Sequence, residues 1–322
     1  MFQQNRVRAT LALTIVLALS LSSLTLTVQS KSKKKQTPKG TPVLWREPAS
    51  ISSRNLYLGP GGAAMKPNLR KITFIREEEG GYSKKFRVRD ASGREWVAKI
   101  GKEAQSETAA VRLLWAIGYV TEINYLVPRV TIPGHGTFEN VRFEARPKSI
   151  KRLDEWKWED NPFVGKRPFQ GLKVMMALLN NWDIKNSNNK ILFVRNGRRG
   201  GELQYIISDL GATFGKSGNV PVFWRITRSR SEPEDYANAD FLDEVKGDRV
   251  SFHYHGRKSG VLDDITVSDV RWIAGLLSRL SDQQIRDAFR AANYTDDEVH
   301  VLTESVRERI NELTNVSREA RR

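Results

Sequence analysis

Four polar residues in the middle of the chain have the types and the spacing that phosphoryl transfer requires. Asp183, Lys185 and Asn188 follow one another as Asp-x-Lys-x-x-Asn, and Asp209 comes after a β-type run over 205–208. A carboxylate can position a hydroxyl group, and a lysine can neutralise a phosphate. An amide oxygen and a second carboxylate can bind magnesium. The sequence therefore predicts that these side chains meet in one site for phosphate transfer.

This order of residues resembles the catalytic loop and the magnesium loop of protein kinases. The chain is similar to an atypical bacterial branch of the protein-kinase-like superfamily, which also resembles the secretory-pathway and spore-coat kinases. From Lys71 to Leu313 it resembles a family of exported bacterial proteins that share the sequences Asn-Asn-Trp-Asp and Ser-Asp-Leu-Gly-Ala-Thr-Phe-Gly. The resemblance implies an ATP-dependent phosphotransferase that uses Mg²⁺ or Mn²⁺, and it implies no particular substrate.

A second motif, upstream of this loop, concerns the phosphates of the nucleotide. The segment 96–100, Trp-Val-Ala-Lys-Ile, is similar to the kinase strand whose lysine holds the α- and β-phosphates and pairs with a glutamate on the next helix. The resemblance assigns the lysine role to Lys99 and the partner role to Glu107, with Glu103 as the alternative. A lysine that faces solvent and a glutamate that stabilises a helix start are the simpler interpretations of these residues.

The resemblance also assigns roles within the central loop. Asp183 is expected to position or deprotonate the acceptor hydroxyl, and Lys185 to neutralise charge on the γ-phosphate. Asn188 and Asp209 are the expected ligands of Mg²⁺ or Mn²⁺. Two features depart from the usual kinase pattern: Asn-Trp stands where His-Arg would precede the aspartate, and the interval from Asn188 to Asp209 is long. These departures leave the class of acceptor open.

Gly80 and Gly81 are the candidates for a turn that covers the phosphates. Glycine would let the backbone N–H groups of such a turn approach the phosphates closely. The full Gly-x-Gly-x-x-Gly pattern is missing, because Ser83, Lys84 and Lys85 follow. An ordinary hairpin turn is an equally good interpretation of the two glycines.

The periodicity of the apolar residues predicts a two-lobed α+β fold. An N-lobe over 66–150 is expected to contain an antiparallel sheet and one helix, as in kinases. Its strands are predicted over 72–75, 85–88, 95–100, 125–132 and 141–145, and its helix over 107–118. A mainly helical C-lobe is expected over 151–322, with a hairpin that joins 190–195 to 203–208. Its helices are predicted over 171–179, 267–280, 282–292 and 296–313, with Ser281 and Thr295 as N-caps of the last two.

The N-terminus has a pattern of its own. Residues 1–30 combine two arginines with an apolar run and small or polar residues, which predicts a signal peptide, with an uncleaved membrane anchor as the alternative. Residues 31–65 are expected to form a basic linker rich in proline and glycine. The lysines of Lys31–Lys39 could contact an anionic envelope surface. The protein is therefore expected to be exported, to the periplasm or the outside of the cell.

Composition narrows the remaining function classes. The formal net charge of +16 over 322 residues favours anionic partners. Nucleic acid is disfavoured, because the aromatic residues do not alternate with the basic ones and no nucleic-acid-binding module is recognised. The absence of cysteine excludes disulfides, thiolate zinc sites and a cysteine nucleophile. The expected partners are a nucleotide and an unidentified hydroxyl acceptor, for which the basic segment 216–239 favours an acidic group.

Two alternative functions remain at this stage. A catalytically inactive pseudokinase would keep the fold and bind nucleotide without transfer, although retention of every charged role argues against it. A basic envelope protein would bind anionic glycan or lipid through its lysine-rich segment and would have no nucleotide site. Nucleotide binding distinguishes the envelope protein from the other two functions, and phosphate transfer distinguishes the kinase from the pseudokinase.

Overall fold

The computed structural model describes residues 38–80, 83–196, 200–218 and 227–319. Residues Thr37–Arg322 cluster as one compact unit. The predicted signal peptide, residues 1–30, lies outside the described residues. Within the described ranges, no helix is both long and apolar enough to cross a membrane.

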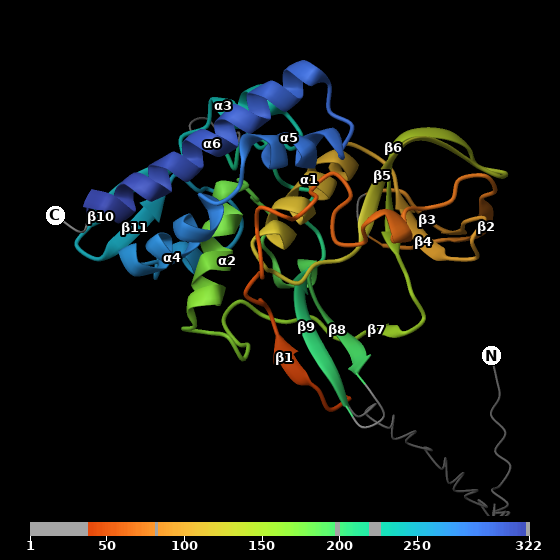
Figure 1. Ribbon diagram of the computed structural model, residues 1–322, viewed down its shortest axis with the longest axis horizontal. Helices are drawn as coiled ribbons and strands as arrows, with labels where there is room; N and C mark the ends of the chain where they lie inside the picture. Colours follow the sequence, from red (N-terminus) through yellow and green to blue (C-terminus); the bar gives the residue numbers. More distant parts are fainter. Residues whose placement is uncertain (1–37, 81–82, 197–199, 219–226, 320–322) are drawn as a thin grey trace, which may run out of the picture. The chain divides into compact units, whose positions relative to one another are not determined.

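A five-stranded antiparallel sheet forms the first half of this unit (Figure 1). Its strands, in the order β2-β3-β4-β6-β5, are β2 (Thr73–Glu77), β3 (Lys85–Arg89), β4 (Glu95–Lys99), β5 (Asn124–Ile132) and β6 (Gly136–Ala145). Successive side chains alternate between the two faces. Phe86, Trp96 and Phe143 pack in an apolar cluster on one face. Lys99 in β4 and Arg142 in β6 are paired neighbours whose side chains point to the opposite face of the sheet from Trp96 and Phe143. Both charged residues are buried on that face.

Helix α1 (Glu103–Ala116) follows β4 and packs against β5 and β6. It begins before the predicted start at residue 107, because an acidic residue in the first turn, Glu103, already favours the helix. Both glutamates that were considered as partners of Lys99 therefore lie on its first two turns. The helix stops at Gly118, whose φ of 105° is in the region that glycine adopts without strain.

The segment before residue 66 is part of the folded unit and differs from the solvated linker expected from its composition. The strand β1 (Thr41–Val43) pairs in parallel with β9 (Gly200–Ile207). With β8 (Asn189–Asn196) and β7 (Ile150–Arg152) they form a four-stranded sheet of order β1-β9-β8-β7. The antiparallel pairing of β8 and β9 confirms the predicted hairpin.

Contacts from far along the chain hold this N-terminal segment in place. Ile51 and Leu56 are fully buried in the main apolar core. Gln284 donates through Nε2 to the carbonyl of Ile51 at 2.8 Å and to that of Arg54 at 2.9 Å. Local composition does not report such long-range partners, so the linker interpretation fails for this stretch.

Helices are the main regular elements of the second half of the unit (Figure 1). They are α2 (Arg167–Leu178), α3 (Pro233–Ala237), α4 (Val267–Leu277), α5 (Asp282–Arg290) and α6 (Asp296–Glu319). A small hairpin, β10 (Leu242–Lys246) and β11 (Arg249–Phe252), and three single turns, η1 (Ala63–Met65), η2 (Asn186–Asn188) and η3 (Ser259–Leu262), complete the described elements. The long helix α6 packs against α3, α4 and α5, and α2 packs against α4.

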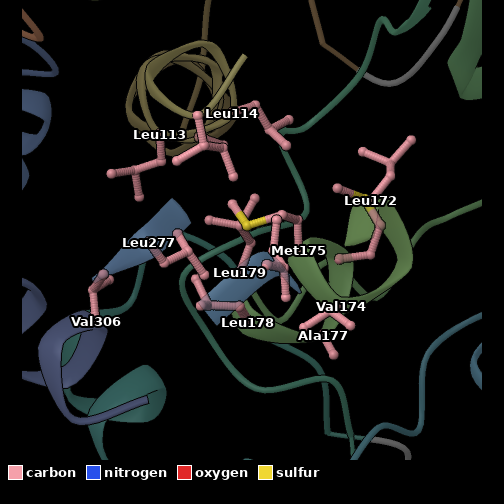
Figure 2. Packing of buried hydrophobic residues seen from close by; sticks show 14 of the residues in the cluster. Leu113, Leu114, Leu172, Val174, Met175, Ala177, Leu178, Leu179, Leu277 and Val306 are labelled. Atoms are coloured by element: carbon pink, nitrogen blue, oxygen red, sulfur yellow. The ribbon is translucent and has the colours of Figure 1, made fainter. Parts of the chain in front are cut away.

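One apolar core joins these helices to α1. Figure 2 shows Met175 and Leu178 of α2 close to Leu114 of α1 and Leu277 of α4. All four side chains are buried. This packing fixes the end of α2, which leads into residues 180–188, the predicted catalytic loop.

The helix ends confirm the predicted caps. Ser281 Oγ accepts a hydrogen bond from the backbone N–H of Gln284, whose side chain accepts in return from the Ser281 N–H. Thr295 Oγ1 accepts from the Glu298 N–H at 3.3 Å. The predicted α+β fold is confirmed: an antiparallel sheet with one helix precedes a mainly helical part, as in a two-lobed kinase-like fold.

Candidate functional site

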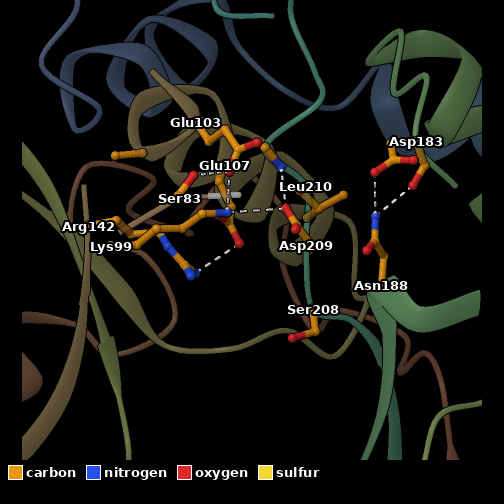
Figure 3. A network of polar contacts seen from close by, with 12 residues as sticks. Ser83, Lys99, Glu103, Glu107, Arg142, Asp183, Asn188, Ser208, Asp209 and Leu210 are labelled. Atoms are coloured by element: carbon orange, nitrogen blue, oxygen red, sulfur yellow. Dashed lines mark hydrogen bonds and ion pairs between the residues drawn. The ribbon is translucent and has the colours of Figure 1, made fainter. Parts of the chain in front are cut away.

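Lys99, the last residue of β4, lies at the centre of a buried ion cluster (Figure 3). Its Nζ is 2.8 Å from Glu103 Oε2, 3.1 Å from Glu107 Oε2 and 3.3 Å from Asp209 Oδ1. Only 2% of Lys99 is exposed. The structure thus brings both glutamates that were considered in the sequence to the same ammonium group, together with Asp209.

A second cation supports the glutamate at the bottom of this cluster. Arg142 on β6 lies 2.9 Å from Glu107 Oε1 and 3.0 Å from Glu144 Oε2. Glu107 is 1% exposed, and burial raises its pKa even though Arg142 and Lys99 act in the opposite direction. Glu107 is therefore held between two cations, Lys99 at one carboxylate oxygen and Arg142 at the other.

Asp209 follows β9 and enters the cluster from the second half of the unit. Its Oδ1 accepts from the Gly211 N–H at 3.1 Å as well as from Lys99. Burial raises the pKa of Asp209, but Lys99 and the Gly211 N–H outweigh it, so the net shift is downward. A Cβ at Gly211 would lie 2.7 Å from Glu103 Cβ, so only glycine lets α1 approach this closely. The side chain of Asp209 remains 41% exposed, which leaves its carboxylate open to a ligand.

Two asparagines set the path of the catalytic loop after α2. Asn180 has a φ of 53°, a left-handed conformation that asparagine tolerates better than most residues. Its Nδ2 donates to the carbonyl of Gly215 at 2.8 Å. Asn181 is fully buried, and its Oδ1 accepts from the Asp183 N–H at 3.3 Å. The asparagines therefore turn the chain out of the helix and fix the backbone of Asp183.

The Asp183 carboxylate is held by the other residues of its loop. Its Oδ2 accepts from Lys185 Nζ at 2.8 Å and from Asn188 Nδ2 at 3.3 Å. Asn188 Nδ2 also donates to the Asp183 carbonyl at 2.7 Å. The Asn188 carbonyl in turn accepts from the Asp209 N–H at 3.2 Å. A continuous set of contacts thus joins Asp183, Lys185, Asn188, Asp209 and Lys99.

The second oxygen of Asp183 faces a residue that was not predicted. Arg257 Nε lies 3.0 Å from Asp183 Oδ1 as an ion pair. This oxygen is buried, and within the described part of the chain it accepts no hydrogen bond. Asp183 therefore has one cation beside each carboxylate oxygen.

The turn between β2 and β3 lies beside the Lys99 cluster. Ser83 Oγ donates to Glu103 Oε2 at 2.6 Å, and Glu103 is itself a partner of Lys99. Gly80 has a φ of 87°, and a Cβ there would meet nothing within 4 Å. Gly81 lies outside the described residues. The described part of the turn is therefore near enough to cover a ligand of Lys99.

Comparison with known proteins adds little at this point. No model of a known protein family matches the chain, and no curated protein matches it. Among solved structures, the chain is similar to the Helicobacter pylori proinflammatory kinase CtkA. The alignment covers 79% of this chain and 98% of that chain, with 12% sequence identity and a TM-score of 0.48. At this level the similarity decides nothing about function, and the contacts within this chain carry the assignment.

The donor atoms near Asp209 suit a hard divalent cation. Asn188 uses its Nδ2 on Asp183, and its Oδ1 has no hydrogen-bond partner among the described residues. The Asp209 carboxylate accepts through Oδ1 and is partly exposed. An amide oxygen and a carboxylate oxygen are ligands that Mg²⁺ and Mn²⁺ accept, usually together with phosphate and water. In the described ranges, no cluster of three or more histidine and acidic side chains could hold a metal alone.

A cavity of about 510 Å³, large enough for a nucleoside, is lined by residues of β7, β8 and the connection after β6. Its apolar lining includes Pro147, Ile150, Leu192 and Val194, which come from the connection after β6 and from β8. Arg152, also in the lining, donates through Nη2 to Ser208 Oγ at 2.7 Å, and Ser208 precedes Asp209 in the chain. The link from the cavity to the ion cluster therefore runs through Arg152 and Ser208, because Lys99, Glu107 and Asp209 do not line the cavity.

Arg142 and Arg257 are the charged site residues that the sequence interpretation missed. Arg142 lies between the apolar residues Val141 and Phe143 in β6, so the alternation of the strand places its charge on the opposite face. This alternation was the signal in the sequence from which Arg142 could have been found. Arg257 lies far beyond Asp183 in a segment without periodicity, so only the folded chain reveals it.

Proposed function

We propose that this chain is an exported kinase-like phosphotransferase that binds ATP with Mg²⁺ or Mn²⁺ and transfers the γ-phosphoryl group to a hydroxyl acceptor. The observation that carries the proposal is the joint contact of Lys99 with Glu107 and Asp209, at 3.1 and 3.3 Å. Such an arrangement would bring a phosphate-binding cation next to a metal-binding carboxylate, as phosphoryl transfer requires. Asn188 connects Asp183 to Asp209, because it donates to the Asp183 carbonyl and accepts from the Asp209 N–H.

Lys99 and the cavity would bind the nucleotide. The apolar walls of the 510 Å³ cavity suit the base, and Lys99 would donate to the α- and β-phosphates. Glu107 would keep Lys99 in place, because Arg142 holds Glu107 from its other side. The turn at Gly80 would cover the phosphates from the sheet.

Asp183 and Lys185 would act on the transferred group. The acceptor oxygen attacks the γ-phosphorus while the bond from that phosphorus to the β–γ bridging oxygen breaks, and ADP leaves with the electron pair of that bond. The hydroxyl proton passes to the Asp183 carboxylate. Lys185, 2.8 Å from that carboxylate and about half exposed, would donate to the γ-phosphate as it moves. A bound Mg²⁺, held by Asn188 Oδ1 and Asp209, would neutralise charge on the phosphates.

Export and the envelope contact belong to the same proposal and rest on the sequence alone. The predicted signal peptide, residues 1–30, would direct the chain out of the cytoplasm, with an uncleaved anchor as the alternative. The lysines of Lys31–Lys39 would then hold the exported protein near an anionic surface.

A thermal-shift titration of the purified protein with ATP and Mg²⁺ tests nucleotide binding. We expect a metal-dependent rise in melting temperature that Asp209→Asn removes, because the amide cannot supply the anionic ligand. Asp160→Asn, a matched change on an exposed loop, should retain the shift. Transfer of labelled phosphate to a hydroxyl acceptor, abolished by Asp183→Asn, would establish the kinase. Binding without transfer to any acceptor would favour a pseudokinase, and a folded protein without any nucleotide shift would refute the nucleotide site.

A further inference from the structure

The loop between β11 and η3 is fixed on the catalytic loop by hydrogen bonds. The Arg257 N–H donates to the carbonyl of Trp182 at 2.7 Å, and Tyr254 Oη donates to the carbonyl of Asn181 at 2.5 Å. Tyr254 is buried, and a Cβ at Gly256 would clash with its hydroxyl group. The sequence Tyr-His-Gly-Arg therefore places Arg257 beside the catalytic loop with a fixed backbone.

The side chain of Arg257 covers one oxygen of Asp183. Arg257 Nε lies 3.0 Å from Asp183 Oδ1, which is buried without accepting a hydrogen bond from the described residues. Lys185 occupies the other oxygen at 2.8 Å, and the Asp183 side chain is only 15% exposed. An acceptor hydroxyl that is to reach Oδ1 must therefore displace the guanidinium.

Arg257 also has donors to spare. Its side chain is 58% exposed, and within the described ranges its two terminal nitrogens have no hydrogen-bond partner. Other cations nearby are engaged: Lys258 pairs with Glu159, and Arg228 donates to the carbonyl groups of Ser217 and His255. Arg257 is thus the cation at Asp183 that is best placed to bind an incoming anion.

Space for the body of an acceptor lies next to this loop. A cavity of about 580 Å³ is lined by Lys258 and Glu159 and extends over Trp158, Phe169 and Val261. Lys258 follows Arg257 directly in the chain, so the cavity and the Asp183 guanidinium contact share this loop, although Arg257 and Asp183 do not line the cavity. Its volume is sufficient for a sugar or for several amino-acid side chains.

We propose that Arg257 recognises the acceptor, and that the acceptor carries a carboxylate or phosphate group close to its reactive hydroxyl. In the free protein the guanidinium covers Asp183. When the acceptor binds, the terminal nitrogens of Arg257 hold its anionic group as a bidentate pair, and Asp183 Oδ1 becomes accessible to the hydroxyl. A neutral acceptor leaves Arg257 on Asp183. This proposal rests on the proposed function, because it assigns the substrate class of the same site.

Chemical labelling of carboxylates tests whether Arg257 shields Asp183, and it does not require enzymatic activity. The purified protein is treated with a water-soluble carbodiimide and an amine, and modification of Asp183 is measured by mass spectrometry, with the partly exposed Asp209 as internal reference. We expect a several-fold rise at Asp183 in Arg257→Gln, and a rise in the wild type when an acidic serine peptide or glycerol 3-phosphate is added. Arg129→Gln, the same change on a strongly exposed residue of β5, should leave the modification unchanged.

Matched acceptors test the selectivity. A serine peptide flanked by glutamates is compared with its glutamine counterpart, and glycerol 3-phosphate is compared with glycerol, which separates a peptide source from a small-molecule source. We expect the wild type to prefer the anionic member of one pair by about tenfold or more. Arg257→Gln should lose that preference, and Arg257→Lys should retain part of it.

The two assays separate the failure of this proposal from that of the proposed function. Equal labelling of Asp183 in the wild type and Arg257→Gln, with and without the anionic probes, overturns the role of Arg257 even if transfer occurs. Transfer with the same selectivity in both proteins overturns it as well. Anion-dependent labelling through Arg257 without any transfer supports anion recognition here and refutes the phosphotransferase.

Discussion

Replacing Lys99 with methionine tests the central ion cluster. Lys99 is 2% exposed, and its Nζ lies within 3.3 Å of carboxylates on Glu103, Glu107 and Asp209. Methionine keeps most of the side-chain volume and removes the charge, which leaves the buried Glu107 with Arg142 at 2.9 Å. Loss of one partner of a buried ion pair costs about 3–5 kcal/mol. Because Arg142 remains, we expect a decrease of about 3 kcal/mol in the free energy of unfolding.

Thermal and urea denaturation of the purified protein measure this decrease. A loss of about 3 kcal/mol corresponds to a fall of about 5 °C in the melting temperature for a unit of this size. Lys102→Met is the matched control, because Lys102 is strongly exposed and, among the described residues, forms an ion pair with Glu232 alone, at 2.7 Å. We expect no measurable change in that variant, since exposed ion pairs contribute little.

A double variant checks the cause of the loss. In Lys99→Met/Glu107→Gln both members of the buried Lys99–Glu107 pair lose their charge, so part of the lost melting temperature should return. The reasoning is refuted if Lys99→Met melts at the same temperature as the control. It is equally refuted if the double variant loses the full sum of the two single changes, because the two charges would then not be coupled.

Further predictions concern two glycines and the decrease in stability at acid pH. Gly211→Ala should lower the melting temperature and remove the metal-dependent nucleotide shift, because the new Cβ would lie 2.7 Å from Glu103 Cβ and would push α1 away from Asp209. Gly275→Ala, in α4 with nothing within 4 Å of its Cβ, should raise the free energy of unfolding by about 0.5–1 kcal/mol, and denaturation that finds it unchanged or lower would contradict this. The pKa of Asp209 is lowered in the folded state, so the stability that its charge contributes is present above about pH 4 and is lost as the pH falls through the folded value. Urea denaturation as a function of pH should therefore find a smaller acid-induced loss in Asp209→Asn than in the wild type, and parallel curves would contradict the assignment.

The parts of the site that lie close together in the chain could be predicted from the sequence, because short sequence spacing limits how far apart the side chains can be. Asp183, Lys185 and Asn188 lie in one short loop, so their contacts depend on few backbone angles. The pairing of Lys99 with a glutamate of the next helix was implied by the resemblance of its strand to that of kinases, whereas the strand pattern alone also fitted a lysine that faces solvent. The sequence favoured Glu107 over Glu103 as the partner of Lys99, but it could not predict that both contact Lys99, because this depends on where α1 begins, and helix ends are the least certain feature of a periodic pattern.

The remaining parts depend on contacts between distant segments. Ile51 and Leu56 lie in a stretch without periodicity, and their burial comes from packing against helices much later in the chain. Arg257 reaches Asp183 only because Tyr254 and Gly256 fix its loop on the catalytic loop. No pattern within either segment contains this information.

The pairing of β1 with β9 has a consequence for solubility. β9 is eight residues long, and without β1 one side of it would present unpaired backbone N–H and C=O groups. Three residues of β1 cover its middle, and Arg46 pairs with Glu202 just beside them. A chain shortened to begin at residue 66, where the sequence pattern places the first lobe, would uncover this strand. Such a fragment is expected to self-associate through the exposed edge of β9. The segment before residue 66 therefore protects the protein from aggregation.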